Sequence, residues 1–295
     1  AEFNDIYSQY LKTLRIEQRQ IKDLSQIPFL PIRFFKDFEI KSGKWPTQQI
    51  YRSSGTTEAA RSSHHMWDEN FYFNHAANSF EKIFGPLKKY HILALLPFYD
   101  IGHSSLIAMA RHFIARSDSK KSGFILNDIQ NGIEVIHSLE ASNQKVLLLR
   151  VSHALLDLAE KGPFNFKHVI VMETGGMKGR KEEVIREELH ARIRKGIRSE
   201  TICSEYGMTE LCSQAYSISD GIFRCTPAMR VYIKEISDPL SASKSTGIIN
   251  IIDLANFHSC SFIETQDLGR VTEKGFEVLG RVDNSEARGC NLLLA

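Results

Sequence analysis

Residues 51–57, Tyr-Arg-Ser-Ser-Gly-Thr-Thr, bring together one basic side chain, four serine and threonine hydroxyl groups and one glycine. Hydroxyl and backbone N–H groups donate hydrogen bonds to phosphate oxygens, and a glycine lets the backbone approach a ligand without a Cβ clash. The Walker A pattern G-x-x-x-x-G-K-[ST] occurs nowhere in the chain. Taken alone, such a cluster is more often an ordinary surface loop. The candidate phosphate-binding residues are Ser53, Ser54, Gly55, Thr56 and Thr57.

A second polar segment, residues 204–210, reads Ser-Glu-Tyr-Gly-Met-Thr-Glu and follows a predicted strand end at 201–203. A tyrosine and a glycine at a strand end can lay an aromatic ring against a planar base, which makes Tyr206 and Gly207 candidates for base binding. Thr209 can donate to a phosphate. Glu210 offers the hard oxygen ligand that Mg²⁺ takes together with substrate phosphates, so we expect it to be the metal ligand.

Three further segments add polar residues or glycines beside predicted strands. Gly175 and Gly176 follow one strand, where a double glycine permits close approach of a ligand. Asp267 precedes a predicted turn, where its carboxylate could accept hydrogen bonds from ribose hydroxyls. Residues 280–283, Gly-Arg-Val-Asp, form the last segment. Taken singly, each of these segments is more often structural. All five segments, including those at 51–57 and 204–210, occur in one order at predicted strand ends, and this favours a shared site.

The central part of the chain predicts the elements that would position these residues. Apolar runs at 91–96, 146–149 and 168–171 are typical of buried strands. The helices expected around them span residues 68–84, 104–114, 127–139, 152–159 and 180–197. Asn127 or Asp128 is expected to cap the third helix and Ser152 the fourth. Alternating strands and helices predict a parallel sheet with helices on its faces, and such sheets bind ligands at the carboxyl ends of their strands.

The flanks differ from this centre. Residues 5–22 have apolar residues at helical spacing, and the prolines and phenylalanines that follow predict an aromatic arm packed on the main body. Short β runs at 230–236, 247–253 and 276–282 predict antiparallel strands. We therefore expect an α/β fold with a large parallel or mixed sheet, flanking helices and a C-terminal antiparallel β subdomain. The expected divisions are an N-terminal helical and aromatic arm, an α/β region with the candidate phosphate-binding residues, and a β subdomain with the segment at 204–210 and the C-terminal tail, at residues 1–45, 46–203 and 204–295.

Composition limits the class of protein. The 295 residues are 42% hydrophobic and 24% charged, as in soluble globular proteins, and the formal net charge of +2 does not indicate nucleic-acid binding. The five cysteines show neither a C-x-x-C pair nor the spacing of a zinc site, which favours free thiols in a reducing compartment. Neither a membrane-spanning apolar run nor a signal pattern is present, so a cytoplasmic location is expected. His64 and His65 are the one adjacent histidine pair, and surface or loop positions are expected for them.

The order of the five polar segments resembles the adenylate-forming enzymes, the superfamily of acyl-CoA synthetases, firefly-type luciferases and nonribosomal adenylation domains. Residues 53–57 are similar to its phosphate loop, and residues 206–210 to its Tyr-Gly-x-Thr-Glu signature. Residues 95–100 stand where that superfamily has a substrate-side aromatic segment. The pair at 175–176 is similar to its adenine-side turn.

Two more positions extend this resemblance. Asp267 matches the ribose-binding aspartate, and Arg281 with Asp283 matches an Arg-x-Asp hinge. Within the superfamily the chain is most similar to the acyl-protein synthetase branch, which includes the fatty-acid-activating component of bacterial bioluminescence. The marks are residues 27–36, Ile-Pro-Phe-Leu-Pro-Ile-Arg-Phe-Phe-Lys, the short length, and the ending at 285–293.

The resemblance implies a reaction. ATP and Mg²⁺ would be used to convert a carboxylic acid, by implication a long-chain fatty acid, to an acyl-adenylate with release of pyrophosphate. Cys290 would then take the acyl group as a thioester, because a thiolate attacks an activated acyl group. The opposite interpretation, a cysteine packed by neighbouring leucines, has equal support. A protein acyl acceptor or a reductase is the expected partner.

The chain departs from the family pattern in two places. Glu58 stands where a glycine is usual, and its carboxylate near phosphates would weaken ATP binding unless Arg52 or Arg61 offsets it. The chain also stops shortly after the hinge, so the C-terminal lid, which carries the catalytic lysine of larger members, is expected to be largely absent. Adenylation would then be slow or need a partner.

Three other functions remain open from the sequence. A ligase of the phenylacetate type would pass the acyl group to coenzyme A instead of Cys290. A nucleotide-binding module would keep the pocket without turnover. A serine hydrolase is weakly suggested by residues 102–106, but Leu106 replaces the second glycine of the G-x-S-x-G motif.

Overall fold

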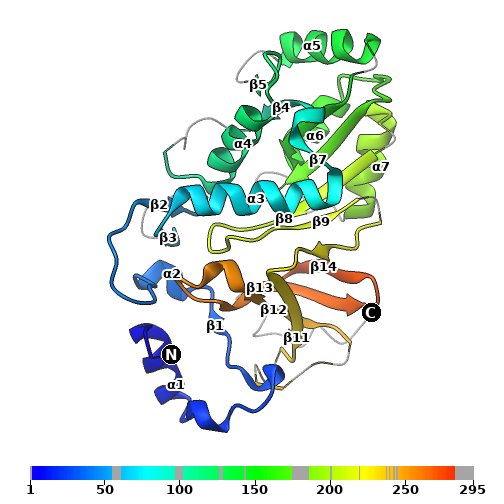
Figure 1. Cartoon of the computed structure of the whole chain (residues 1–295). Coiled ribbons are helices and arrows are strands. Elements are labelled where there is room, and N and C mark those ends of the chain that lie inside the picture. Colours follow the sequence, from blue (N-terminus) through cyan, green and yellow to red (C-terminus); the bar gives the residue numbers. More distant parts are fainter. Residues whose placement is uncertain are drawn as a thin grey trace.

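Two sheets are stacked along the long axis of the molecule in the computed structural model (Figure 1). A larger sheet with helices on both faces occupies one end, and a smaller sheet with the helix at the start of the chain occupies the other. The structure describes residues 2–54, 61–96, 102–125, 129–142, 144–174, 186–199, 201–218, 220–236, 238, 240–241, 243 and 245–282.

The larger sheet has seven strands in the order β10-β9-β8-β7-β6-β4-β5. The strands β4 to β8 pair in parallel, while β9 and β10 are antiparallel additions next to β8. In chain order the strands are β4 (His91–Leu95), β5 (Gly123–Phe124), β6 (Val146–Val151), β7 (Val169–Thr174), β8 (Thr201–Tyr206), β9 (Ala215–Ser217) and β10 (Arg224–Cys225).

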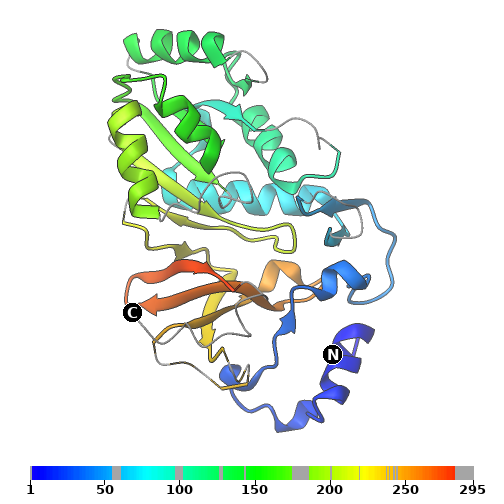
Figure 2. The same cartoon turned by 180° about the vertical axis from the view of Figure 1, so that it is seen from behind.

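Alternation along the buried strands divides the core of this sheet into two layers. Leu147 and Leu149 of β6 point to one face and join a cluster with α3 (Glu69–Phe84) and α4 (Ser105–Arg116). Leu148 points to the other face. The cluster on that face includes residues of three helices, α5 (Ile129–Ala141), α6 (Ser152–Ala159) and α7 (Arg186–Ile197). Successive strand residues face opposite sides, so a fully apolar strand serves both layers. Figure 2 shows α6 and α7 on the side opposite α3.

The smaller sheet has five strands, in which β13 pairs with three others. Its strands are β1 (Leu30–Pro31), β11 (Met229–Lys234), β12 (Gly247–Asp253), β13 (Phe262–Thr272) and β14 (Gly275–Arg281). The β1 strand pairs with β13 in parallel, and the other pairings are antiparallel. The helix α1 (Asp5–Thr13) packs Tyr7 and Leu11 into the core of this sheet. Asn4 donates to the carbonyl of Ser259 at 2.7 Å, across 255 positions of sequence.

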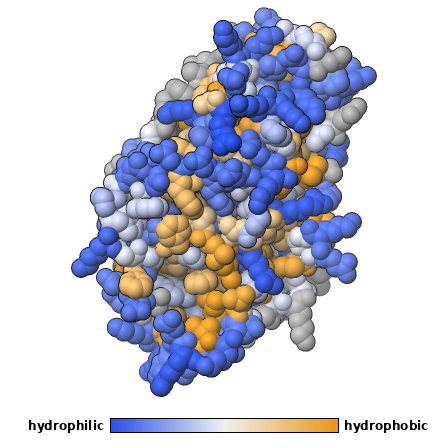
Figure 3. All heavy atoms as spheres, in the orientation of Figure 1, coloured by the Kyte–Doolittle hydropathy of each residue, from blue (hydrophilic) through white to orange (hydrophobic). Residues whose placement is uncertain are grey.

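A hairpin of β2 (Gln49–Arg52) and β3 (Ser63–Met66) forms the third, two-stranded sheet. Short helical segments connect the remaining parts. They are α2 (Phe34–Asp37), η1 (Gln18–Gln20), η2 (Leu24–Gln26), η4 (Leu87–Lys89) and η6 (Leu254–Asn256). Figure 3 shows hydrophobic residues gathered on one face of the molecule. Near α3, the exposed rings of Trp67 and Phe257 have centroids 5.9 Å apart, and Phe257 also contacts Phe71 of α3.

The expected α/β architecture with a C-terminal antiparallel β part is confirmed. Most central elements agree within a few residues. The candidate caps of α5, Asn127 and Asp128, and residues 180–185 lie outside the described residues. No described helix is long and apolar enough to cross a membrane.

Four local predictions are wrong. The first helix ends at Thr13 instead of continuing to residue 22. Ser152 is the first residue of α6 and not its cap, because its hydroxyl donates to the Glu173 carboxylate at 2.5 Å. His64 is a buried strand residue and not a surface one. The expected turn after Asp267 is a β-bulge inside β13.

Candidate functional site

The carboxyl end of β8 is the centre of the candidate site. The strand lies between β7 and β9, and its last residue, Tyr206, is followed by the turn at residues 207–210. Parallel strands end at a common edge, so the turn lies where α/β sheets bind ligands. Gly207 begins it, and a Cβ there would lie 2.2 Å from Oε1 of Glu205. A side chain at this position would therefore displace the Glu205 carboxylate, which accepts a hydrogen bond from Thr174.

Three of the predicted nucleotide-binding residues come together beside β8. The Tyr206 hydroxyl donates to Oδ2 of Asp267 at 2.7 Å, and Nε of Arg281 lies 3.8 Å from Oδ1 of the same carboxylate. Asp267 and Arg281 are direct partners across β13 and β14. The larger and the smaller sheet thus meet at this trio. Burial and the nearby Asp267 carboxylate raise the pKa of Tyr206 well above its usual value, so its hydroxyl remains a donor.

The Tyr206 ring also belongs to an aromatic cluster. It is buried, with ring centroids 5.7 Å from Phe223 and 5.4 Å from Phe276. The Tyr206 ring packs against two phenylalanines, while its hydroxyl group makes the hydrogen bond that orients Asp267. Stacking of the Tyr206 ring on adenine stays a prediction.

The backbone of the turn is bonded from two directions. The carbonyl of Thr209 accepts a hydrogen bond from Nδ1 of His64 on β3 at 2.8 Å. The carbonyl of Glu210 accepts one from Nδ2 of Asn256 in η6 at 2.6 Å. Glu210 itself is buried. Both hydrogen bonds use backbone carbonyls, so they fix the backbone of the turn whatever its side chains bind.

The bond between His64 and Thr209 also joins the two strongest sequence signals. The β2–β3 hairpin carries the candidate phosphate loop between its strands, and Ser53 closes the base of that loop. Its N–H donates to the carbonyl of Ser62 at 3.0 Å, and its hydroxyl accepts from the N–H of Ser62 at 2.9 Å. Ser54 follows directly on the same strand end. The remaining predicted residues Gly55, Thr56, Thr57, Gly175, Gly176 and Cys290 lie outside the described residues, as do Glu58 and Asp283.

A polar cluster, buried except for the partly exposed Glu205, lies next to the turn, at the ends of β7 and β8. Glu173 accepts from the hydroxyl of Ser204 at 2.8 Å and lies 3.7 Å from Nε2 of His190. Beside it, the Thr174 hydroxyl donates to Glu205. Burial, with a smaller contribution from Glu173, raises the pKa of Glu205 to about 7. We call Glu173, Thr174, His190, Ser204 and Glu205 the acidic cluster.

Sequence reasoning missed the residue that holds the chain after the turn. Asp253, at the end of β12, is fully buried. It accepts hydrogen bonds from the N–H groups of Cys212 at 3.0 Å, Ser213 at 2.9 Å and Ala255 at 3.0 Å, and from the Ser213 hydroxyl at 2.6 Å. Its partners are distant in the sequence, and an aspartate after an apolar strand reads as an ordinary turn residue.

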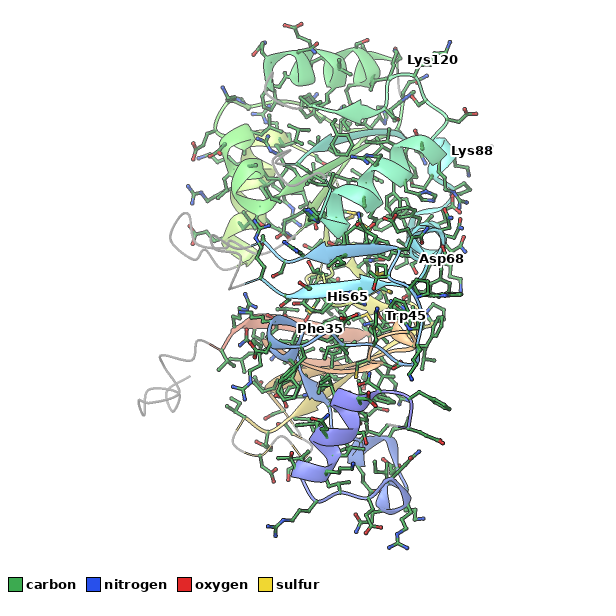
Figure 4. All side chains as sticks on the ribbon, turned by 90° about the vertical axis from the view of Figure 1, so that its left-hand side faces the viewer. Phe35, Trp45, His65, Asp68, Lys88 and Lys120 are labelled. Carbon is green, nitrogen blue, oxygen red and sulfur yellow. The ribbon has the colours of Figure 1, made fainter. Side chains whose placement is uncertain are left out.

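Two hollows in the described part of the chain are lined by residues other than these. One, of about 680 Å³, is lined by Lys88, Lys89, Lys120, Lys121 and Lys145 among others. It is open and basic, and Figure 4 shows Lys88 and Lys120 at the end of the molecule distant from the smaller sheet. The contacts around Tyr206 are better evidence for a site than this hollow, because they bring predicted residues together.

Comparison with solved structures gives the fold. No protein-family model matches the sequence, and the search of curated proteins gave no match. Among solved structures, O-succinylbenzoate coenzyme A synthetase from Bacillus subtilis in complex with ATP and magnesium ion matches at 19% identity with a TM-score of 0.56. The match covers 83% of this chain and 52% of that one. The fold is that of the N-terminal domain of adenylate-forming enzymes.

Two further structures share this fold. A fatty acyl-adenylate ligase from L. pneumophila, in complex with acyl adenylate and pyrophosphate, has 14% identity and a TM-score of 0.56, covering 84% of this chain and 52% of that one. An ATP-bound RpMatB-BxBclM chimera has 16% identity and a TM-score of 0.58, covering 83% and 49%. The chain thus spans about half the length of these structures.

Proposed function

We propose that this chain activates a carboxylic acid with ATP and Mg²⁺ to form an acyl-adenylate. The observation that carries the proposal is the 2.8 Å hydrogen bond between His64 and Thr209, which joins the hairpin of the candidate phosphate loop to the signature turn. The trio of Tyr206, Asp267 and Arg281 supports it from the other side of the turn. Complexes of similarly folded enzymes with ATP and with acyl adenylate agree with it.

In the proposed reaction a substrate carboxylate oxygen attacks the α-phosphorus of ATP, and the bond to the bridging oxygen of pyrophosphate breaks. The chain contributes by positioning the reactants and stabilising charge. Ser53, Ser54 and residues 55–57 would bind the β- and γ-phosphates. Residues 175–176 would admit the adenine. Asp267, oriented by Tyr206, would accept from the ribose hydroxyls, and Arg281 would balance its charge.

Glu210 would hold Mg²⁺ at the signature turn, with Thr209 donating to a phosphate. A buried carboxylate on a turn whose backbone is fixed fits a cation that requires well-placed oxygen ligands. Bound there, Mg²⁺ would neutralise charge on the departing pyrophosphate.

For the second half-reaction we propose that the acyl group passes to the Cys290 thiolate, which would expel AMP and form a thioester. A long-chain fatty acid is the proposed substrate, and a reductase or other acyl acceptor the proposed partner. Transfer to coenzyme A is the alternative, since one similarly folded enzyme is a coenzyme A synthetase.

ATP–pyrophosphate exchange with a panel of fatty and aryl acids tests the first half-reaction. We expect exchange with one acid class, and a loss of at least roughly 100-fold in Glu210→Ala, the size typical of removing one charge-stabilising group. Glu188→Ala, which removes an exposed carboxylate on α7, is the control and should keep full exchange. Tight ATP binding without exchange for any acid would contradict the enzyme function and leave a nucleotide-binding module.

A labelled acid tests the second half-reaction. After incubation with ATP, denatured wild-type protein should carry label that hydroxylamine releases, and Cys290→Ala should carry none. Cys225→Ala removes a different cysteine, which is partly exposed, and should label normally. Formation of acyl-coenzyme A without protein labelling would show that the acyl acceptor is coenzyme A and not Cys290.

A further inference from the structure

Three buried side chains that can ligate a metal ion lie together behind the signature turn. They are His64 on β3, Cys212 after the turn, and His258 after η6, and their ligand atoms all lie within 4.8 Å of one another. Each side chain is buried, so solvent does not satisfy them. The three belong to segments far apart in the sequence, which is why the spacing of cysteines and histidines gave no sign of the cluster.

His64 is held in the orientation of a ligand. A backbone carbonyl only accepts, so the 2.8 Å contact with Thr209 requires a proton on Nδ1. Nε2 then accepts a hydrogen bond from Oγ of Ser259 at 3.0 Å, and this hydroxyl would turn its proton away when the Nε2 lone pair binds a metal ion. Metal-binding histidines commonly donate their other ring N–H to a carbonyl in this way, which fixes both the tautomer and the ring orientation.

His258 gives an independent sign that a ligand is missing. Neither of its ring nitrogens has a hydrogen-bond partner among the described residues, although the side chain is only 3% exposed. The Ala255 carbonyl lies close enough to act as a weak hydrogen-bond acceptor for the ring, but the contact falls outside the distance and angle of a regular hydrogen bond. A buried polar group without a partner is costly, and a metal ion would supply one. The His64 and His258 rings are parallel within 3°, with centroids 5.4 Å apart.

The backbone around Cys212 fixes the third ligand. Its N–H donates to Oδ2 of Asp253 at 3.0 Å and to Oδ1 of Asn256 at 2.9 Å. Burial, and to a lesser degree Asp253, raises the pKa of the Cys212 thiol. Without a metal ion the thiol therefore stays protonated. A bound divalent cation would favour the thiolate instead, because a coordinating thiol loses its proton.

Aromatic rings enclose the cluster. Phe35 meets His64 edge-on at 5.7 Å, and Trp45 meets His258 edge-on at 5.8 Å. In Figure 4, Phe35, Trp45 and His65, the neighbour of His64, all lie where the β2–β3 hairpin approaches the smaller sheet.

We propose that His64, Cys212 and His258 bind one structural Zn²⁺ ion, with Oγ of Ser259 completing a tetrahedral set. Imidazole nitrogen and thiolate sulfur are the donors of structural zinc sites, and the serine hydroxyl would be an additional, less usual ligand. Ligand bonds of about 2.0–2.3 Å would require the widest separation between ligand atoms to shorten by about 1 Å. The Cys212 thiol releases its proton to solvent as the sulfur–zinc bond forms. The ion links the hairpin, the segment after the signature turn and the smaller sheet, and it does not depend on the proposed adenylation.

Metal analysis of protein made without a histidine tag tests this site. We expect about one zinc ion per chain in the wild type, and at least a roughly tenfold lower content in Cys212→Ser and in His258→Gln. Cys260→Ser and His112→Gln are the matched controls, since these residues lie outside the cluster, and both should retain zinc. Equal zinc content in all five proteins would overturn the proposal.

Cobalt replacement keeps the test decisive if a variant fails to fold. Wild-type protein stripped with a chelator and titrated with Co²⁺ should develop a thiolate-to-cobalt charge-transfer band and tetrahedral d–d bands, with a rise in melting temperature. Circular dichroism checks that the stripped protein is folded. A folded, stripped wild type that binds neither Zn²⁺ nor Co²⁺, or that binds Co²⁺ without the charge-transfer band, would overturn the site.

Discussion

The signature turn and the acidic cluster adjoin each other at the end of β8 but are held in different ways. His64 and Asn256 donate hydrogen bonds to the backbone carbonyls of residues 209 and 210, and Asp253 accepts them from the backbone N–H groups of residues 212 and 213. These partners belong to the hairpin and to the region of the smaller sheet. The acidic cluster is held by side chains bonded to side chains within the larger sheet. We therefore expect substitution of the partner residues to destabilise the turn. We expect a change in protonation to alter the stability that the acidic cluster contributes.

Asp253→Ala should have the largest effect, because it removes the acceptor of several buried donors. We expect a loss on the order of 4 kcal/mol in the free energy of unfolding, since each buried donor left unpaired costs about 1–3 kcal/mol and the costs add incompletely. Urea unfolding measures it. Asp220→Ala, at a more exposed carboxylate, should cost under about 1 kcal/mol. Similar losses in the two variants would contradict the anchoring role of Asp253.

Glu205→Gln should change how stability depends on pH. The pKa of Glu205 is about 7 in the folded protein against an ordinary value of 4.5, so folding favours the protonated form. Stability from this group is complete below the ordinary pKa and is lost as pH rises through the folded one. The loss above neutral pH is roughly 3 kcal/mol.

The Gln side chain stays neutral and can still accept from Thr174. Glu205→Gln should therefore match the wild type at about pH 4 and exceed its stability by up to roughly 3 kcal/mol at about pH 8. Urea unfolding at both values provides the measurement. A constant difference between the two proteins across that range would show that Glu205 titrates normally.

Gly207→Ala tests the place where the two regions touch. The added methyl group would lie 2.2 Å from Oε1 of Glu205, and relieving such a clash costs about 1–3 kcal/mol. In a Glu205→Ala background the same change should cost under about 1 kcal/mol, because the obstructing carboxylate is gone. Thermal or urea unfolding of the four proteins gives the coupling energy. Additive effects would mean that Gly207 is needed for another reason, such as ligand approach.

Tyr206→Phe should have the smallest effect on stability, about 1 kcal/mol, because it removes one hydrogen bond while keeping the ring in its aromatic cluster. Its effect on nucleotide binding should be clearer, since Asp267 loses the group that orients it. We expect weaker ATP binding by calorimetry in Tyr206→Phe and no further weakening when Asp267→Asn is added. Unchanged ATP affinity in the single variant would separate this contact from the nucleotide site.

The sequence was sufficient for the repeated architecture because apolar runs and helical periodicity are local signals. Strand β6 and helix α3 were predicted close to their observed bounds for this reason. Strand β13 was missed because Asp267 and Gly269 resemble a turn in isolation. The pairing of β13 with β12 and β14 extends the strand through a bulge, where Gly269 admits the carbonyl of Glu277.

The residues of the candidate site also fall into two groups, those that a local sequence pattern marks and those that it does not. Tyr206, Asp267 and Arg281 were recognised by motif, and the structure brings them together. Asp253 and His64 could not be recognised, because their roles come from partners that only tertiary folding brings near. A buried histidine or aspartate carries no local mark of burial when its sequence neighbours are mixed.

The pairing of β1 with β13 has a consequence for synthesis. Leu30 pairs with Ile263, so the smaller sheet joins an early segment of the chain to a late one. While a ribosome is making the chain, residues 5–31 have no sheet to join until β13 has emerged, although the strands of the larger sheet can already assemble. Nascent chains arrested before and after β13 should therefore differ sharply in protease sensitivity at the first helix.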